Sequence, residues 1–315
     1  MNPAVSVVIP VYNGAATIGD TLRSLLAQSG PAASREIIVV DNGSTDATRE
    51  IARSFDVTLA EEATRGPAAA RNRGLALARG EIIAHCDADT IVTRRWLAEI
   101  VAPLRDPETA LVTGETLAYR PATGPERYAA ASGLFDGQRA ATREKFPFAP
   151  SLNMAVRRVD ALAAGGWDET LATGEDVDFS HRVLLLPPYA SHSGEAPNNR
   201  IAYASKAVLF HRNRASDRAF RDQARSYGRG AAQLYLRHPR TLRWTPKMSI
   251  VLARTLALRG VAPPVLAALA RLRLASHERV EFATYHRIWV RAFWKGFAEE
   301  FRAGRVRPPR RCSCA

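Results

Sequence analysis

The first 90 residues predict an α/β fold built on a doubly wound, mostly parallel β-sheet. Short β-branched runs alternate there with helical segments, in the order strand, helix, strand, helix, strand, helix, strand. Three of these strand candidates also end in polar turns. Because the carboxyl ends of strands in such a sheet border a ligand-binding crevice, we expect the three turns to converge on one site.

The first strand and helix are the most regular part of the pattern. Val5–Val11 is a β-branched run, which predicts a strand buried on both faces. Residues 12–14 (Tyr-Asn-Gly) form the polar turn after it. An amphipathic helix is predicted at about residues 16–28. The glycine pattern of a dinucleotide-binding turn is missing after this strand, which argues against a dinucleotide site.

The second unit repeats this order with a more polar turn. Residues 36–40 form an apolar run, which predicts the second strand. It leads into residues 41–46 (Asp-Asn-Gly-Ser-Thr-Asp), a turn rich in capping residues, and a helix is expected to begin near Thr45. Residues 57–60 predict a short third strand. A helix of small residues at 66–78, closed by Gly80, completes the unit.

The fourth strand, at residues 81–86, ends in two aspartates, Asp87 and Asp89. Two carboxylates at one strand end repel each other unless a cation lies beside them. Mg²⁺ and Mn²⁺ prefer oxygen ligands and often share them with substrate phosphates. An Asp-X-Asp pair alone is more commonly a turn, so its significance depends on the rest of the chain.

The middle of the chain is less regular. A strand is predicted at residues 110–116, and a helix at 124–142. A kinked apolar loop is expected at 146–150. A short helix near 159–162 ends at a pair of glycines, and another helix opens at 174–179. Acidic residues in a first helical turn are favoured by the helix dipole, so Glu175 and Asp176 also fit simple capping.

Composition and charge limit the class of protein. The 315 residues are 46% hydrophobic and 24% charged, with a net charge of +13. Residues 1–211 carry 21 Lys and Arg against 25 Asp and Glu, whereas residues 212–315 carry 23 against 6. This asymmetry predicts a boundary near residue 212 and confines the basic character to the C-terminal third of the chain.

Cysteine content and hydropathy predict the location of the protein. Three cysteines, Cys86, Cys312 and Cys314, provide no disulfide framework. No signal-peptide pattern opens the sequence, and no apolar stretch approaches the roughly 18–20 residues of a membrane span. We expect a cytoplasmic protein, either soluble or peripheral on the inner face of the membrane.

Taken together, the motifs resemble those of the inverting glycosyltransferases of family 2, which have the GT-A fold. They occur in the order of that family over about residues 4–212, and together they are specific although each alone is weak. The matching segments are residues 5–13, 37–48, 65–80 with its Ala-Arg-Asn-Arg-Gly core at 70–74, 87–89, 165–169, 174–178, and His211.

The resemblance implies a nucleotide-sugar-binding part at about residues 1–116 and an acceptor side at about 117–212, before a helical, basic extension at 213–315. In the first part it implies that Asp41 hydrogen-bonds the nucleobase and that Arg71 lies near the diphosphate, where a guanidinium fits phosphate. The other residues implied to line the nucleotide-sugar crevice are Pro10, Val11, Tyr12, Asn13, Asp87 and Ala88.

The resemblance also implies a metal and a base. Asp89, with Asp87 and His211, would bind Mn²⁺ or Mg²⁺, although a lone histidine after a strand is more often structural. Asp176 would be the general base that takes the proton of the acceptor hydroxyl, with Glu175 beside it.

On the acceptor side the resemblance places Trp167 and Asp168. For Trp167, a place in the core is nearly as good an interpretation as a contact with a sugar. Residues 184–199 are longer than the usual connection in the family, and we expect a loop beside the acceptor there.

The basic extension predicts successive helices over residues 215–303. In the last of them, Phe282, Tyr285, Trp289, Phe293, Phe297 and Phe301 share one face, and Arg287, Arg291 and Lys295 share the opposite face. This helix either packs on the catalytic domain with a solvated basic face or lies on an anionic membrane surface. No motif that reads nucleic acid accompanies the charge, so no nucleic-acid partner is expected.

The sequence therefore predicts an inverting transfer of a sugar from a nucleoside diphosphate to a glycan or lipid-linked acceptor. Two alternatives stay open on a similar fold. A sugar nucleotidyltransferase would need a Gly-rich loop bearing Arg or Lys after the first strand, which residues 12–16 do not supply. A non-catalytic nucleotide-sugar-binding scaffold would not need the acids at 87, 89 and 176.

Overall fold

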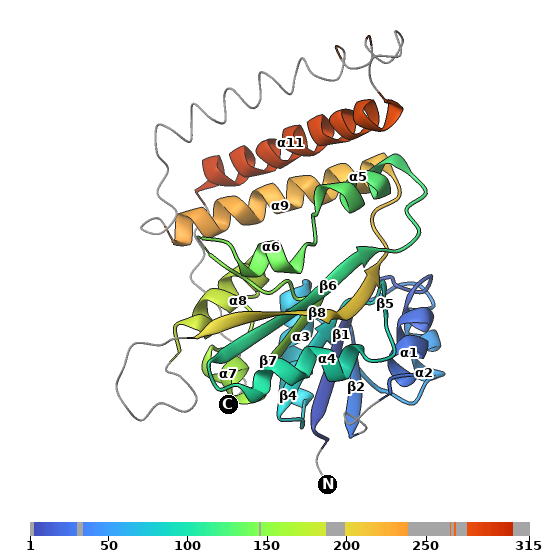
Figure 1. Cartoon of the computed structure of the whole chain (residues 1–315), viewed down its shortest axis with the longest axis vertical. Coiled ribbons are helices and arrows are strands. Elements are labelled where there is room, and N and C mark those ends of the chain that lie inside the picture. Colours follow the sequence, from blue (N-terminus) through green and yellow to red (C-terminus); the bar gives the residue numbers. More distant parts are fainter. Residues whose placement is uncertain are drawn as a thin grey trace.

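The computed structural model describes residues 3–29, 34–144, 146–186, 199–238 and 276–304, and the single positions 265 and 268. Within these ranges the chain forms one eight-stranded sheet with helices on both faces. Two long helices, α9 and α11, lie side by side beyond the sheet (Figure 1).

The strands are β1 (Val5–Val11), β2 (Arg35–Asp41), β3 (Thr58–Glu61), β4 (Ile82–Cys86), β5 (Thr90–Val92), β6 (Thr109–Ala118), β7 (Asn153–Arg157) and β8 (Arg200–His211). Their order in the sheet is β3-β2-β1-β4-β7-β6-β8-β5. Strands β3, β2, β1 and β4 are parallel to one another, as are β6 and β8. The mostly parallel α/β sheet predicted from the sequence is confirmed.

The helices are α1 (Ile18–Leu26), α2 (Thr48–Arg53), α3 (Pro67–Leu77), α4 (Trp96–Val101), the 3₁₀ helix η1 (Ala102–Arg105), α5 (Gly124–Ser132), α6 (Gly137–Ala141), α7 (Arg158–Ala163), α8 (Glu175–Leu184), α9 (Asp217–Arg237) and α11 (His277–Ala303).

Two strands were not predicted. Strand β7 runs antiparallel between β4 and β6, and β5 pairs antiparallel with β8. β5 has only three residues, and β7 passes directly into α7 without a turn signal, so neither carries a local pattern that separates it from its neighbours.

The single helix predicted for residues 124–142 is wrong. Gly133 adopts a left-handed conformation, with a φ of 63°, and ends α5. A new helix, α6, then begins after Asp136, whose side chain accepts a hydrogen bond from the backbone N–H of Arg139. A left-handed glycine after a helix is a common helix stop.

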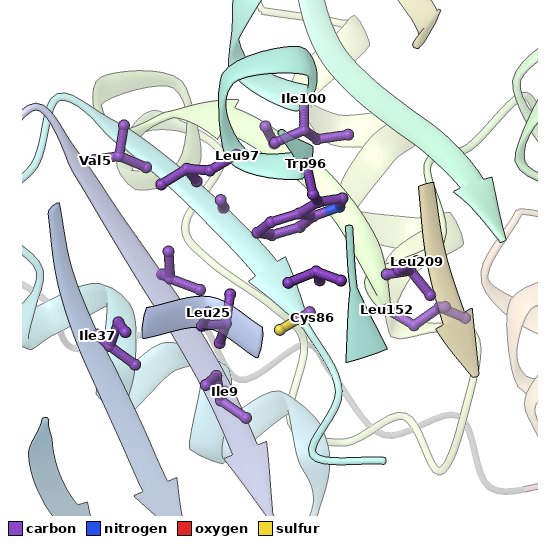
Figure 2. Close-up of a cluster of buried hydrophobic side chains, with 14 of the residues drawn as sticks. Val5, Ile9, Leu25, Ile37, Cys86, Trp96, Leu97, Ile100, Leu152 and Leu209 are labelled. Carbon is purple, nitrogen blue, oxygen red and sulfur yellow. The ribbon is translucent and has the colours of Figure 1, made fainter. Parts of the chain in front are cut away.

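Strand β1 is buried on both faces because its side chains alternate between two apolar layers. Val5, Val7 and Ile9 enter the cluster on the side of α1 and α4, whereas Val8 enters the opposite cluster. Figure 2 shows the first cluster, in which Leu25 and Trp96 from the helices pack near Ile9 and Cys86 from the strands.

Helix α3 approaches the sheet closely because it consists largely of small residues. A Cβ placed on Gly74 would lie 2.3 Å from Cγ1 of Val8, so only glycine fits against β1 at this point. The close approach is consequential for the site, because α3 also carries Arg71.

The C-terminal helices pack through their aromatic faces. The ring of Trp289 lies 5.2 Å from that of Phe220 and 5.6 Å from that of Tyr227, both on α9. Most of the aromatic face predicted for α11 is thus used within the protein, although Phe282 and Phe301 at its ends are exposed. None of the helices in the described part of the chain combines the length and the hydropathy that crossing a bilayer requires.

Several sequence predictions lie outside the described residues. They are the helix breaks near Pro239, Pro246 and Pro263, most of the loop at 184–199, residues 305–311, and Cys312 and Cys314.

We predict that Gly228→Ala destabilises the pairing of α9 with α11. A Cβ at this position would lie 1.9 Å from the carbonyl oxygen of Phe293. The steric cost, about 1–3 kcal/mol, exceeds the gain in helix propensity of about 1 kcal/mol. The melting temperature should therefore fall by several degrees in calorimetry. Asp222→Ala, at an exposed position of the same helix, is the control, and equal melting of the two variants would contradict the prediction.

Candidate active site

The predicted nucleotide side of the site lies where β1 and β2 end. Tyr12 comes directly after β1 with 53% of its surface exposed, and the guanidinium of Arg65 lies 4.6 Å from the centre of its ring. Asp41, the last residue of β2, is fully buried. Its Oδ2 accepts a hydrogen bond from the backbone N–H of Ser44 (3.1 Å), whereas Oδ1 has no partner among the described residues. Oδ1 is therefore a buried acceptor that the described residues leave without a hydrogen bond.

Asn13 shapes the turn after β2 rather than facing the crevice freely. Its Oδ1 accepts a hydrogen bond from the backbone N–H of Thr45 (2.8 Å), and its own N–H donates to the hydroxyl of Ser44 (2.8 Å). Pro10 and Val11 are the last residues of β1, and Val11 accepts a hydrogen bond from the backbone N–H of Asn42. The structure therefore brings the turns after β1 and β2 together, as the sequence predicts.

Arg71 connects the end of β4 to the start of α8. One terminal nitrogen of its buried guanidinium donates to Asp87 (3.1 Å) and the other donates to Glu175 (2.7 Å). Although burial alone would lower it, the negative charges of Asp87, Glu175 and Asp176 raise the pKa of Arg71 overall. The guanidinium thus stays charged and holds these acids next to one another.

Asp89 and His211 lie side by side because Thr90 of β5 pairs with His211 of β8. Nε2 of His211 is 3.5 Å from Oδ1 of Asp89, an atom with no hydrogen-bond partner in the described part of the chain. The other ring nitrogen of His211 is 2.9 Å from the side-chain oxygen of Asn213. If Nδ1–H donates there, the lone pair of Nε2 faces Asp89.

These two residues fit a divalent cation shared with a substrate. Burial and the negative charge of Asp87 raise the pKa of Asp89, and His211 lowers it by less, so the pKa is raised overall. The negative charge of this carboxylate is therefore not fully balanced by the positive groups around it. No group of three or more His, Cys, Asp or Glu suited to a metal occurs among the described residues. An Mg²⁺ or Mn²⁺ site that takes one or two protein ligands and several substrate oxygens needs no such group. Ala88, between the two aspartates, is nearly buried, and its carbonyl accepts a hydrogen bond from Thr21.

Asp176 lies in the first turn of α8. Gly174, the residue before this helix, has a left-handed conformation with a φ of 81°. Burial, together with the negative charge of Glu175, raises the pKa of Asp176 to about 7, and Arg71 opposes this rise. A carboxylate whose pKa lies near neutrality is suited to take a proton.

Trp167 and Asp168, which the sequence predicts on the acceptor side, are both buried. Trp167 is fully buried, stacks on Phe179 with ring centres 4.0 Å apart, and donates its indole N–H to Ser151 (3.2 Å). The interpretation of Trp167 as a core residue is therefore the one that the structure supports. Asp168 is also buried, and it forms an ion pair with Arg237 at the end of α9.

Three residues near the site were missed by the sequence reasoning: Arg65, Arg214 and Tyr227. The guanidinium of Arg214 lies 3.7 Å from Oδ2 of Asp89. Tyr227 on α9 lies close enough for the charges of Asp176, Glu175 and Asp87 to act on it. Of the three, only Arg65 had a signal in the sequence, because it begins the segment 65–80 that matches a family motif.

Comparison with known proteins decides the family. The sequence pattern of Glycosyl transferase family 2 matches residues 6–162, which contain β1 to β7 and the residues at the ends of β1, β2 and β4. Residues 6–162 belong to this family. The resemblance inferred from the motifs is thereby confirmed.

Two curated relatives illustrate the similarity. Glycosyltransferase AglE of Haloferax volcanii is 34% identical over 189 residues, which make up 58% of this chain and 61% of that protein. The pre-mycofactocin glycosyltransferase of Mycobacterium tuberculosis is 32% identical over 244 residues, 75% of this chain and 48% of that protein. The chain thus spans about half to three fifths of the length of these two relatives.

Solved structures show the same fold. The mannosyltransferase PcManGT from Pyrobaculum calidifontis, in complex with GDP-Man and Mn²⁺, matches with a TM-score of 0.63 at 22% identity and covers 95% of this chain and 88% of its own. S. aureus TarS 1–349 in complex with UDP matches with a TM-score of 0.50 at 20% identity, over 97% of this chain and 92% of its own. The chain therefore has the GT-A fold, with a C-terminal helical region.

We predict opposite effects on stability for two neighbouring acids of α8. The folded-state pKa of Asp176 is about 7, well above the unfolded value near 4, so ionising it costs stability increasingly between about pH 4 and pH 7. Asp176→Asn should raise the melting temperature by a few degrees at pH 8, about 1–3 kcal/mol, and by less at pH 5.

Asp178 is the matched contrast. Burial would raise its pKa, but the hydrogen bond with His238 and the charge of Arg182 lower it overall. Its ionised form therefore stabilises the fold above the unfolded pKa, and Asp178→Asn should lower the melting temperature at pH 8. Thermal unfolding of both variants at the two pH values tests this, and a loss of stability in Asp176→Asn at pH 8 would count against the assignment.

Proposed function

We propose that this chain transfers a sugar, with inversion, from a nucleoside diphosphate to a hydroxyl group of a glycan or lipid-linked acceptor. The observation that carries the proposal is the convergence, at one edge of the sheet, of a buried acceptor (Asp41), a candidate metal pair (Asp89 and His211) and a carboxylate of raised pKa (Asp176). Arg71 links the donor and acceptor sides.

In the proposed reaction the acceptor oxygen attacks the anomeric carbon from the side opposite the diphosphate. The bond between this carbon and the diphosphate oxygen breaks, and Asp176 takes the proton of the attacking hydroxyl. The pKa of about 7 leaves a substantial fraction of Asp176 ionised at neutral pH. Glu175, whose carboxylate accepts a hydrogen bond from Arg71, helps to orient the site.

Asp89 and His211 would hold Mn²⁺ or Mg²⁺, which supplies positive charge to the leaving diphosphate. Two observations support this assignment: Asp89 has an oxygen without a hydrogen-bond partner in the described residues, and PcManGT, of similar fold, was solved with Mn²⁺. Asp87 accepts a hydrogen bond from Arg71 and is proposed to face the ribose rather than to carry the metal alone.

The domain division at about residue 212 and the membrane contact are part of the same proposal. The rings of Trp289 and Phe297 pack on α9, so the aromatic face of α11 is not the one proposed to contact a membrane. An anionic membrane surface would instead contact the basic residues Arg287, Arg291 and Lys295.

We predict that two substitutions separate donor binding from chemistry. Asp89→Ala should lower the affinity for nucleoside diphosphate in the presence of Mn²⁺ by about tenfold or more, because a metal ligand is lost. Asp176→Asn should leave that affinity within about twofold and reduce turnover of the nucleotide sugar by about 100-fold or more. Calorimetry with Mn²⁺ and an assay of released diphosphate over a panel of nucleotide sugars measure the two effects. Unchanged turnover in Asp176→Asn would remove it as the base.

We also predict that UDP binds more tightly than GDP. Oδ2 of Asp41 already accepts the N–H of Ser44, whereas Oδ1 has no partner among the described residues, so we expect Oδ1 to be the acceptor for the nucleobase. One such oxygen suits the single imide N–H of uracil better than the two adjacent N–H donors of guanine. The unmatched donor of guanine should weaken GDP about tenfold. Titration of both nucleotides in Mn²⁺ tests this, with Asp41→Ala as the variant in which the difference should disappear; tighter binding of GDP would refute it.

A further inference from the structure

Helix α9 is attached along the segment that leads into α8. The hydroxyl of Thr173 donates to the carbonyl of Ser226 (2.9 Å), and the backbone N–H of Ala172 donates to the side chain of Gln233 (3.0 Å). Farther along α9, Arg237 contacts Asp168. The segment that carries the proposed base is therefore held by a helix from beyond residue 212.

The two segments also touch at their backbones. A Cβ on Gly230 would lie 2.2 Å from the carbonyl oxygen of Thr173, and a Cβ on Gly174 would lie 2.8 Å from Cδ1 of Leu234. Side chains larger than hydrogen do not fit at these points without a shift, so α9 and the start of α8 have one defined register. This fixes where the side chains of α9 stand relative to Asp176.

Tyr227 comes directly after Ser226 and is partly buried. Its ring meets that of Trp289 edge-on, at 89° and 5.6 Å between centres, which locks its orientation from the side of α11. Burial raises the pKa of the phenol, and the charges of Asp176, Glu175 and Asp87 raise it further, so the hydroxyl stays protonated.

Within the described residues the hydroxyl of Tyr227 forms no hydrogen bond, to Asp176 or to any other group, and the charge of Asp176 is the largest of those that act on it. Because α9 lies against residues 172–174, directly before the helical turn that carries Asp176, a ligand bound at this carboxylate can extend to the phenol of Tyr227. A ligand with an O–H for the carboxylate and a neighbouring oxygen for the phenol engages both groups. A sugar or another vicinal diol has this pair of groups.

We propose that Tyr227 is a specificity-determining residue of the acceptor site, donating a hydrogen bond to an oxygen adjacent to the hydroxyl that Asp176 deprotonates. The proposal rests on the function proposed above. It adds that α9 forms one wall of the acceptor site, and that the acceptor has a second oxygen on the carbon next to its reacting hydroxyl, as in a vicinal diol.

The test uses the full chain with Tyr227→Phe and, as matched control, Tyr235→Phe. Tyr235 is two turns farther along α9, where its ring packs on Phe297 and Phe301. With the nucleotide sugar that the wild type turns over fastest, glycerol serves as the diol acceptor in competition with water. The partition between glyceryl glycoside and free sugar is measured, together with the KM for glycerol and the melting temperature of each variant.

In Tyr227→Phe we expect the rate of hydrolysis to stay within about twofold of the wild type, while the partition towards glycerol falls about 3- to 10-fold through a higher KM, the effect of one lost hydrogen bond. Tyr235→Phe should retain the wild-type partition. An unchanged partition in Tyr227→Phe, an equal fall in Tyr235→Phe, or a wild type that makes no glycerol product while hydrolysing the donor would each overturn the proposal. Absence of both hydrolysis and Mn²⁺-dependent nucleotide binding in the wild type would instead reject the underlying glycosyltransferase function.

Discussion

The guanidinium of Arg71 is the interaction on which the arrangement of the site depends. It is buried on α3 and is bonded to an acid from the end of β4 and to another from the start of α8, which are 88 residues apart in sequence. Removing one partner from such a buried set leaves an uncompensated charge and typically costs about 3–5 kcal/mol. Arg71 therefore holds the end of β4 beside the start of α8, and the small residues of α3 that let this helix approach β1 bring the guanidinium within reach.

Much of the fold can be predicted from the sequence because its central strands are buried on both faces. The runs that became β1, β2 and β4 consist of apolar residues bounded by polar turns, and local pattern is sufficient to place them. Helix α3 was recognisable by its small residues and by Gly80. The glycine at 133 shows the limit of this approach, because a residue that breaks a helix in the structure sits within a segment whose composition is otherwise helical.

The position of a candidate site residue could be predicted where its motif comes directly after a strand, and not where that position depends on pairing between distant segments. Asp89 meets His211 only because β5, a strand of three residues, pairs with the end of β8. Trp167 lies in a matching motif, yet its indole is stacked on Phe179 in the core, and burial of a side chain cannot be read from a motif. Tyr227 had no local signal except the glycines at 228 and 230, whose close contacts become meaningful once α11 and the segment before α8 are in place.

The attachment of α9 to residues 168–178 has a consequence for the order in which the protein matures on the ribosome. The turns after β1, β2 and β4 all lie within the first 90 residues, which are synthesised early. The segment carrying Asp176 is synthesised next, but the contacts that Ser226, Gln233 and Arg237 make with it form only about 50 to 70 residues later. A nascent chain therefore contains these turns before α9 can hold residues 168–178 in position, and this helix completes that part of the fold.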